Sequence, residues 1–233
     1  MGYNKRQSEK TGCLFVIVPE DPENEDGNMR YRCDTQEKFT GAGNVKEDVI
    51  MLRIGMLTSG GDCQALNAAM RGVVKGICSK RNDVEIYGFK DGYKGLIYAD
   101  FSMLMSKDFS GILTRGGTIL GTSRQPFKLM RVPDKDGLDK VEAMKHTYHK
   151  LNLNCLVILG GNGTHKTANM LREEGLNVIT LPKTIDNDLW GTEMTFGFQS
   201  AVDIATDTID RIHTTATSHS RVFIIEVMGH KVG

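Results

Sequence analysis

The spacing of hydrophobic positions changes near the end of the first 50 residues. Before that point the chain shows little periodicity, with an acidic patch at residues 20–27 and a glycine-containing stretch at residues 41–44. A segment of this kind buries too little apolar surface to offset the entropy lost when a chain becomes ordered. We therefore expect residues 1–50 to be a disordered or loosely attached extension, and residues 54–233 to form the folded part.

In the folded part, short apolar runs alternate with segments in which apolar residues recur every three or four positions. The runs predict strands at residues 54–57, 84–89, 155–159, 178–181 and 222–227. The periodic segments predict amphipathic helices at residues 66–77, 166–174 and 201–212. Gly175 is placed to end the middle helix, because glycine readily adopts the left-handed conformation found after helix ends.

Strands that alternate with helices are typical of an α/β fold with a mostly parallel sheet. The run at residues 155–159 is apolar throughout, which indicates a strand covered on both faces and hence a three-layer sandwich. A buried parallel strand normally leads into a crossover helix, but only six residues follow the strand predicted at 222–227. We therefore expect this fold to be truncated at its C-terminus.

The charge and cysteine content narrow the class of protein. Lys plus Arg and Asp plus Glu both number 29, so no basic excess favours nucleic acid or an anionic membrane as a partner. The five cysteines are scattered without CxxC spacing, which indicates neither a zinc site nor a disulfide framework. No apolar run approaches the length of a membrane span. We expect a cytoplasmic protein, since the cytoplasm keeps thiols reduced.

Two glycine-rich turns follow predicted strands, Thr58-Ser59-Gly60-Gly61-Asp62 and Gly160-Gly161-Asn162-Gly163-Thr164. Glycines let a ligand approach the backbone, and the helix N-terminus behind each turn offers amide donors to phosphate. The first turn alone is as well explained by a structural connection. The second holds more glycine than a simple turn needs, and Thr164 can add a hydroxyl donor, so phosphate binding is favoured there.

A third turn, Pro182-Lys183-Thr184-Ile185-Asp186-Asn187-Asp188, brings two carboxylates together with a lysine and a threonine. Phosphoryl transfer requires such groups: a carboxylate to accept the proton of the attacking hydroxyl, and metal ions and cations to neutralise charge. The alternative is a polar turn in which Asp and Asn make local hydrogen bonds to the backbone.

Residues 54–233 resemble the phosphofructokinase family, and specifically its N-terminal, nucleotide-binding part. The motifs that carry the resemblance are Gly60-Gly61-Asp62, Asn67-Ala68-Ala69, Arg115-Gly116-Gly117-Thr118, Gly121-Thr122-Ser123-Arg124, Gly160 to Thr164, Lys183 to Asp188, Gly197-Phe198, Ser218-His219-Ser220-Arg221 and Glu226-Val227-Met228-Gly229. A Gly-Gly-Asx-Gly-Thr loop also occurs in lipid and NAD kinases. The turn at residues 184–188 and the run at residues 226–230 distinguish this chain from them.

The resemblance implies a 6-phosphofructokinase, which transfers a phosphoryl group from ATP to the 1-hydroxyl of fructose 6-phosphate in glycolysis and uses Mg²⁺. Asp186 would be the general base. The nucleotide would be held by Gly61, Arg124, Gln125, Gly161, Asn162, Gly163 and Thr164. The sugar phosphate would meet Thr184, Ile185, Asp186, Arg221, Met228, Gly229 and His230. Asn162 and Asp188 would bind the metal ion, and family members assemble as homo-oligomers.

The chain departs from the family pattern at several of these positions. Asn162 stands where an Asp is frequent, and His230 where many members have an arginine that stabilises the transferring phosphoryl group. Gly163 is typical of ATP users, whereas Lys183 is typical of pyrophosphate users, and a carboxylate at position 163 would obstruct the α-phosphate of ATP. We expect ATP as the donor. A pyrophosphate-dependent enzyme and an inactive nucleotide-binding fragment remain alternatives, and we expect this chain to be poorly active alone.

Overall fold

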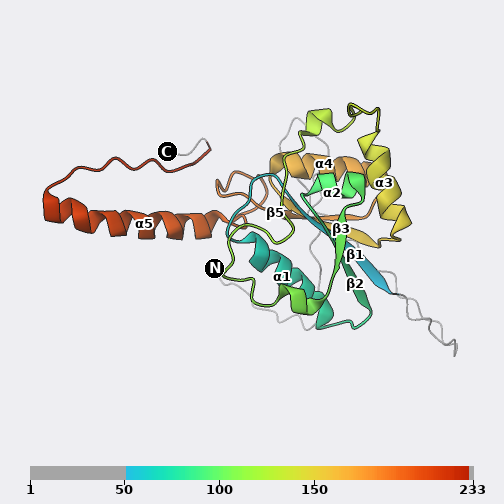
Figure 1. The fold of residues 1–233 in the computed structure, drawn as a ribbon, viewed down its shortest axis with the longest axis horizontal. Helices are drawn as coiled ribbons and strands as arrows, with labels where there is room; N and C mark the ends of the chain where they lie inside the picture. Colours follow the sequence, from blue (N-terminus) through green and yellow to red (C-terminus); the bar gives the residue numbers. More distant parts are fainter. Residues whose placement is uncertain (1–50, 231–233) are drawn as a thin grey trace, which may run out of the picture. The chain divides into compact units, whose positions relative to one another are not determined.

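The computed structural model describes residues 51–230 (Figure 1), which belong to one unit. The extension predicted at residues 1–50 lies outside the described residues. The strands are β1 (Leu52–Ser59), β2 (Val84–Phe89), β3 (Phe101–Leu104), β4 (Cys155–Gly160) and β5 (Val178–Pro182). The helices are α1 (Leu66–Cys78), α2 (Tyr93–Tyr98), α3 (Lys140–Lys150), α4 (Asn162–Glu173) and α5 (Phe198–His219), with short 3₁₀ turns at Ser106–Phe109 and Phe127–Leu129.

The strands form one 5-stranded sheet in the order β3-β2-β1-β4-β5. β1 pairs in parallel with β2 and β4, β4 pairs in parallel with β5, and β3 is antiparallel to β2. The chain moves outward in one direction from β1 and in the other from β4, so strand order reverses between these two strands. In open α/β sheets, ligands bind beyond the carboxyl ends of the strands at such a reversal.

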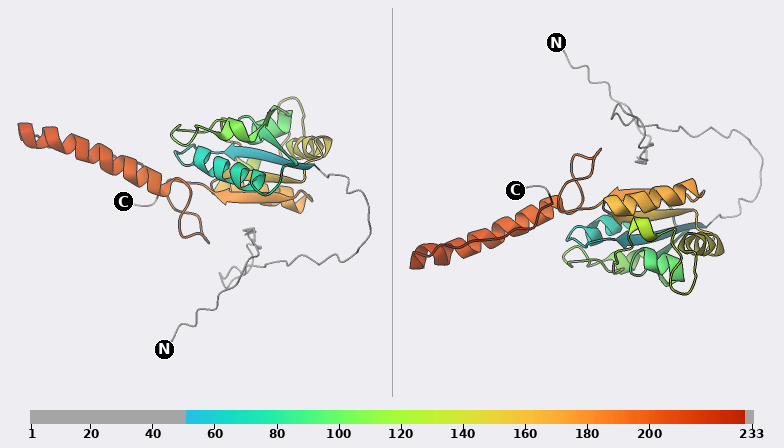
Figure 2. Two further views of the ribbon diagram at one scale, coloured as in Figure 1. Left: turned by 90° about the horizontal axis from the view of Figure 1, so that it is seen from below. Right: turned by 90° about the horizontal axis from the view of Figure 1, so that it is seen from above.

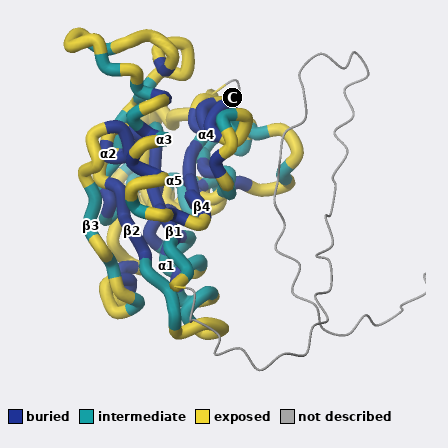
Figure 3. Tube along the Cα trace, turned by 90° about the vertical axis from the view of Figure 1, so that its right-hand side faces the viewer, coloured by how far each residue is buried: buried dark blue, intermediate teal, exposed yellow. Residues whose placement is uncertain are grey.

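Helices cover both faces of the sheet, as Figure 1 shows. On one face α1 buries Leu66, Met70 and Val74 against the side chains of the central strands. On the other face α2, α3 and α4 pack against the same strands, and the two apolar clusters do not share a residue. The strands β1, β2 and β4 and the helix surfaces that face them hold most of the buried residues of this unit (Figure 3). The predicted three-layer α/β architecture with a mostly parallel sheet is confirmed.

Most predicted elements are present, with shifted ends. The strands predicted from apolar runs appear as β1, β2, β4 and β5, and Gly175 follows α4 with a φ of +90°. α4 begins at Asn162, four residues before the predicted start, because the glycine-rich turn itself forms the first helical turn. The sequence pattern did not predict β3 or α2. In α3 only Val141, Met144, Thr147 and Tyr148 are buried.

The strand predicted at residues 222–227 is wrong. These residues are extended but lie in no strand, and they return beside α5 toward the sheet (Figures 1 and 2). Val222 and Ile224 are 94% and 98% exposed, whereas Phe223 and Ile225 are 44% and 39% exposed. The alternation is typical of a strand with one covered face, but a strand also needs a hydrogen-bonded neighbour. None of the described strands pairs with this segment.

The helix predicted at residues 201–212 is part of the longer α5, which has no buried residue. Its apolar side chains, including Ile204 and Ile209, are 50% and 40% exposed. No helix in the described part of the chain combines the length and the apolar character that a membrane span requires.

Candidate functional site

The three turns singled out in the sequence meet at one edge of the sheet. The turn at residues 58–62 follows β1, the turn at residues 160–164 follows β4, and the turn at residues 182–188 follows β5. Because β1, β4 and β5 are parallel neighbours, their carboxyl ends lie side by side. The site is therefore at the reversal of strand order, where this class of sheet binds ligands.

The turn after β1 is fastened to the loop that precedes Arg124. The Thr58 hydroxyl donates to the Gly121 carbonyl at 2.8 Å, and the Gly60 amide donates to the Ser123 carbonyl at 3.1 Å. The Thr122 hydroxyl in turn donates to the Gly60 carbonyl at 2.7 Å. Gly60 has a φ of +90°, a left-handed conformation that glycine adopts without strain. These bonds fix where Arg124 leaves the loop.

Gly61 and Arg124 then face the same open space. A Cβ atom on Gly61 would lie 3.9 Å from an Nη of Arg124, so the guanidinium stands over the glycine backbone. Arg124 is exposed and Gln125 is half-buried beside it. The backbone of the turn and a cation of this loop are therefore both available to an anionic ligand.

The turn after β4 becomes the N-terminus of α4. Gly161 is the extended N-cap residue, and no side chain caps the helix there. The amides of Asn162, Gly163 and Thr164 lie in the first helical turn, where backbone N–H groups have no partner within the helix. Asn162 and Gly163 are exposed, and a Cβ atom on Gly163 would meet nothing within 4 Å. This open helix N-terminus is suited to a phosphate group.

Thr164 has an internal role in this arrangement. Its side chain is buried, and its hydroxyl donates to the Ser59 carbonyl at 3.3 Å, which links the ends of β1 and β4. A Cβ atom on Gly160 would overlap the Thr164 side chain. Gly160 is therefore required by close packing, while the Thr164 hydroxyl holds the loop in place.

Lys183 lies between the first two turns. Its side chain is 5% exposed, and its ammonium group donates to the Gly61 carbonyl. Its own amide donates to the Gly160 carbonyl at 2.9 Å. Burial lowers the pKa of Lys183, and the nearby charge of Arg124 lowers it further. One buried cation thus supports both turns that are expected to bind phosphate.

The carboxylates of the third turn face the end of the described chain. The backbone amide of His230 donates to a carboxylate oxygen of Asp186 at 2.8 Å, and its Nδ1 lies 3.1 Å from a carboxylate oxygen of Asp188. The contact with His230 lowers the pKa of Asp188. Of the residues expected to bind sugar phosphate, Thr184, Asp186 and His230 are therefore brought together.

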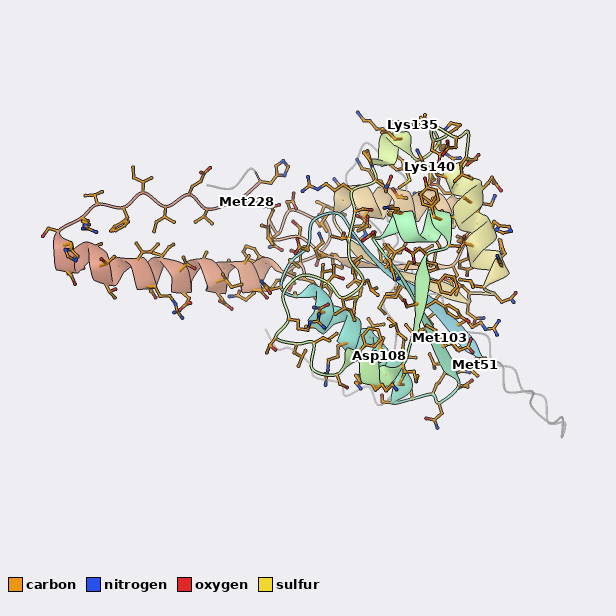
Figure 4. All side chains as sticks on the ribbon, in the orientation of Figure 1. Met51, Met103, Asp108, Lys135, Lys140 and Met228 are labelled. Carbon is orange, nitrogen blue, oxygen red and sulfur yellow. The ribbon has the colours of Figure 1, made fainter. Side chains whose placement is uncertain are left out.

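The remaining expected substrate residues differ in their distance from the carboxylates. Ile185 lines an open groove of about 320 Å³ that Cys63, Ala201 and Ile204 also border. Arg221 follows the end of α5, and a 22-residue helix is about 33 Å long, so Arg221 lies far from the three turns. Met228 is 83% exposed on the returning segment (Figure 4), and Gly229 is exposed beside it.

The oxygen ligands of this site suit a Mg²⁺ ion whose coordination is completed by phosphate groups of a ligand. No group of three or more His, Cys, Asp or Glu side chains among residues 51–230 could hold a metal ion. Asp186, Asp188 and the Asn162 amide supply oxygen atoms on neighbouring turns. Mg²⁺ in proteins is commonly held by one or two carboxylates together with substrate phosphates and water, and this donor set fits that mode.

Two residues that shape the third turn were not predicted from the sequence. Asn187 has a φ of +50° and bonds through its side chain to the backbone on both sides of Met194. Thr195 is buried, and its hydroxyl donates to the Thr184 carbonyl at 2.7 Å. The Asn within Asp-Asn-Asp was a signal for the first, since Asn tolerates this conformation. Nothing in the sequence distinguished Thr195 from other threonines.

Comparison with known proteins places these features in a family. The family model described as Phosphofructokinase matches residues 53–233. The ATP-dependent 6-phosphofructokinase of Spirochaeta thermophila is 63% identical over 186 residues, which cover 77% of this chain and 50% of that protein. That of Propionibacterium freudenreichii is 52% identical over 182 residues, or 78% of this chain and 48% of that protein. The chain thus spans about half the length of the curated relatives it matches.

The fold agrees with a solved structure of the same kind. The phosphofructokinase of Saccharomyces cerevisiae superposes with a TM-score of 0.66 at 30% sequence identity. The match covers 76% of this chain and 26% of the yeast chain.

Proposed function

Because the chain belongs to the phosphofructokinase family, we propose that it takes part in phosphoryl transfer from ATP to the 1-hydroxyl of fructose 6-phosphate. One observation carries the proposal. An open helix N-terminus, a buried lysine and a pair of carboxylates come together beyond the ends of β1, β4 and β5, at the reversal of strand order. Phosphoryl transfer depends on such positioning and charge stabilisation more than on covalent chemistry by the protein.

The donor nucleotide is bound by the first two turns. Its phosphates accept hydrogen bonds from the amides at the start of α4, namely those of Asn162, Gly163 and Thr164. Arg124, placed over Gly61, adds positive charge on the other side. Gln125 and Gly161 complete the expected contacts of the nucleotide along the same edge.

Asp186 acts as the general base. Its carboxylate accepts the proton of the 1-hydroxyl while that oxygen attacks the γ-phosphorus, and the bond from the γ-phosphorus to the leaving ADP oxygen breaks. Fructose 1,6-bisphosphate and ADP leave, and Asp186 returns its proton to water. Thr184 and His230, which both bond to the Asp186 carboxylate, lie where the reacting end of the sugar would be. Arg221, Ile185, Met228 and Gly229 remain expected contacts of the sugar phosphate.

Mg²⁺ would be held by Asp188 and Asn162 together with the phosphates of the nucleotide. When bound, it neutralises charge on the phosphates. The side chain of Asn162 supplies an uncharged oxygen, so the nucleotide must contribute more of the binding than in relatives with an Asp at this position.

Two observations favour ATP over pyrophosphate as the donor. Space around Gly163 is open, with nothing within 4 Å of a built Cβ atom, and a nucleotide needs that space. The relatives that are 63% and 52% identical are named ATP-dependent enzymes. Lys183 is the feature shared with pyrophosphate users, and in this chain it binds the Gly61 carbonyl. The Gly163→Asp variant should weaken ATP binding at least 10-fold, because its carboxylate would repel the phosphates at the start of α4.

Assembly with further copies and a cytoplasmic location belong to the same proposal. The uncovered apolar side chains of α5 and residues 222–228 support assembly, since contiguous apolar surface favours association. The described cysteines, Cys63, Cys78 and Cys155, are free thiols, which suits a reducing compartment.

A coupled assay for fructose 1,6-bisphosphate, run with ATP and with pyrophosphate, tests the proposal. We expect weak turnover with ATP, as the expected poor activity of this chain alone implies, and a further loss of about 10²-fold to 10⁴-fold in Asp186→Asn, which keeps the shape of the side chain but cannot accept the proton. Nucleotide binding is measured in parallel by calorimetry. Turnover with pyrophosphate alone would establish the alternative donor. ATP binding without turnover in the wild-type chain would reduce the function to that of a nucleotide-binding fragment.

A further inference from the structure

The Asp186 carboxylate is held through one oxygen by the Thr184 hydroxyl and through the other by the His230 amide. The Asp186 amide donates to Thr184 Oγ1 at 3.0 Å, and the same hydroxyl donates to Asp186 Oδ2 at 3.3 Å. One oxygen atom therefore holds both the backbone and the side chain of the proposed base. A movement of Thr184 would release the Asp186 amide and Oδ2 and leave the carboxylate held by the His230 amide alone.

Thr184 is in turn held in place by Thr195. The Thr195 hydroxyl donates to the Thr184 carbonyl at 2.7 Å, and Thr195 is 3% exposed. The Gly197 backbone packs against the same carbonyl, since a Cβ atom on Gly197 would lie 3.6 Å from it. Thr195 is too deeply buried to reach a ligand, so its hydroxyl can act on the reaction only through Thr184.

Thr195 is itself fixed by Asn187, which lies between the two carboxylates in sequence. The Asn187 side-chain carbonyl accepts from the Thr195 amide at 2.9 Å, and its NH₂ group donates to the Glu193 carbonyl at 3.1 Å. Asn187 adopts a left-handed φ of +50°, which Asn tolerates better than most residues. Its amide group thus closes the loop formed by residues 187–195.

We propose that Thr195 and Asn187 are positioning residues for Asp186, an inference that rests on the proposed function. The chain of contacts runs from Asn187 to Thr195, then to Thr184, and ends at the Asp186 carboxylate. No link in it involves the first two turns, which are held by Lys183 and Thr164. Breaking it should therefore change the chemical step and leave nucleotide binding intact.

Thr195→Val tests the link from Thr195 to Thr184, because it removes the hydroxyl and keeps the volume of the side chain. We expect kcat to fall by about 10-fold to 100-fold, the size of effect that a misplaced catalytic group produces, with an unchanged KM for ATP. Thr195→Ser retains the hydroxyl and should restore most of kcat. Thr147→Val, at an equally buried threonine in α3, controls for the loss of a buried hydroxyl and should leave kcat unchanged.

Asn187→Gly tests the link from Asn187 to Thr195. Glycine accepts the left-handed conformation without strain, so this variant removes the bonds of the amide side chain at the cost of added backbone freedom. We expect the same pattern as in Thr195→Val, a lower kcat at constant KM for ATP. A kcat equal to that of the wild type in both variants would overturn the inference.

Amide hydrogen exchange gives a readout that does not depend on turnover. The Asp186 amide is bonded to the Thr184 hydroxyl, so Thr195→Val should speed its exchange, while amides of β4 keep their wild-type rates. Thr195→Ser should not. If the wild-type chain has no turnover but this exchange pattern holds, the proposed function fails for this chain and the positioning contact stands. If exchange at Asp186 is unchanged in Thr195→Val, the positioning role is overturned whether or not the chain is active.

Discussion

The site is assembled from two regions that differ in how they are held. The edge of the sheet, with the turns after β1, β4 and β5, is fixed by buried groups such as Lys183, Thr164 and Thr195. The second region, α5 and residues 221–230, contains no buried residue in its helix and exposes much of its apolar surface. Its contact with the carboxylates is made through His230.

The difference indicates which of the proposed ligand contacts have a geometry fixed by packing within this chain. The proposed nucleotide contacts and the base are positioned by hydrogen bonds within the sheet unit, so their geometry follows from local packing. The proposed sugar-phosphate contacts at Arg221, Met228 and Gly229 lie on exposed backbone without strand partners. Donor binding should therefore be more robust to change than acceptor binding, and the variants below test this contrast.

The largest effect is expected where the sheet edge is most closely packed. Gly160→Ala places a methyl group on the Thr164 side chain and should lower the free energy of unfolding by about 1–3 kcal/mol. Gly163→Ala is the matched control, because its methyl group meets nothing within 4 Å and alanine favours a helix. Urea denaturation measures both. Equal stability of the two variants would show that the turn after β4 is not rigidly packed.

The contrast between Gly160 and Gly163 also shows what could and what could not be predicted from the sequence. The two glycine-rich turns and their place after strands were predictable, because apolar runs and glycine spacing are local signals. Which glycine is needed for packing and which is free was not, since that depends on where the Thr164 side chain points. The roles of Asn187 and Thr195 escaped prediction for the same reason, because their partners are backbone atoms set by the path of the loop.

The strand predicted at residues 222–227 failed for a different physical reason. Its β-branched residues and alternating exposure are those of a strand, but a strand forms only where another strand satisfies its backbone. The sequence signal for a strand is local, whereas the partner must come from elsewhere in the structure. The site residues beyond α5 were therefore predicted as a group and are found apart, with His230 at the carboxylates and Arg221 at the far end of the helix.

A second test concerns the buried cation of the sheet edge. Lys183→Met removes the ammonium group and leaves the Gly61 carbonyl without that donor, which should cost about 1–3 kcal/mol, partly offset because a buried charge is also removed. The lowered pKa of Lys183 also predicts the direction in which stability changes with pH. Burial lowers the pKa of Lys183, so the unfolded state binds more protons, and wild-type stability gains as pH rises from this lowered pKa toward the ordinary value of 10.5.

The measurement is the difference in unfolding free energy between wild type and Lys183→Met from pH 7 to pH 10 (about the range below the ordinary lysine pKa). Taking the difference removes the contributions of groups that do not interact with Lys183, such as Cys155, whose pKa burial raises to about 11. We expect the wild type to gain relative to the variant as pH increases. A difference that stays constant with pH would mean that Lys183 is not held in a desolvated position.

Deleting residues 198–233 should have a smaller effect on the sheet unit. Since α5 has no buried residue, the free energy of unfolding should change by less than about 1 kcal/mol. Leu171→Ala in α4 is the control for sensitivity, because this fully buried side chain should cost about 2–5 kcal/mol. ATP binding by the shortened chain should be retained. A strong loss of stability or of ATP binding would show that the second region supports the first.

The smallest effect is expected for His230→Ala, which removes the side-chain contact with Asp188 and keeps the backbone bond to Asp186. Both side chains are more than one third exposed, so the contact should contribute no more than about 1 kcal/mol after solvent screening. Because His230 lowers the pKa of Asp188, this stabilisation is present above the ordinary aspartate pKa and is lost as pH falls through the lowered value. Urea denaturation at pH 7 and at acidic pH should therefore show a small difference between wild type and variant that disappears in acid. A large difference at pH 7 would mean that the segment beyond α5 is held as firmly as the sheet edge, and the contrast between the two regions would no longer hold.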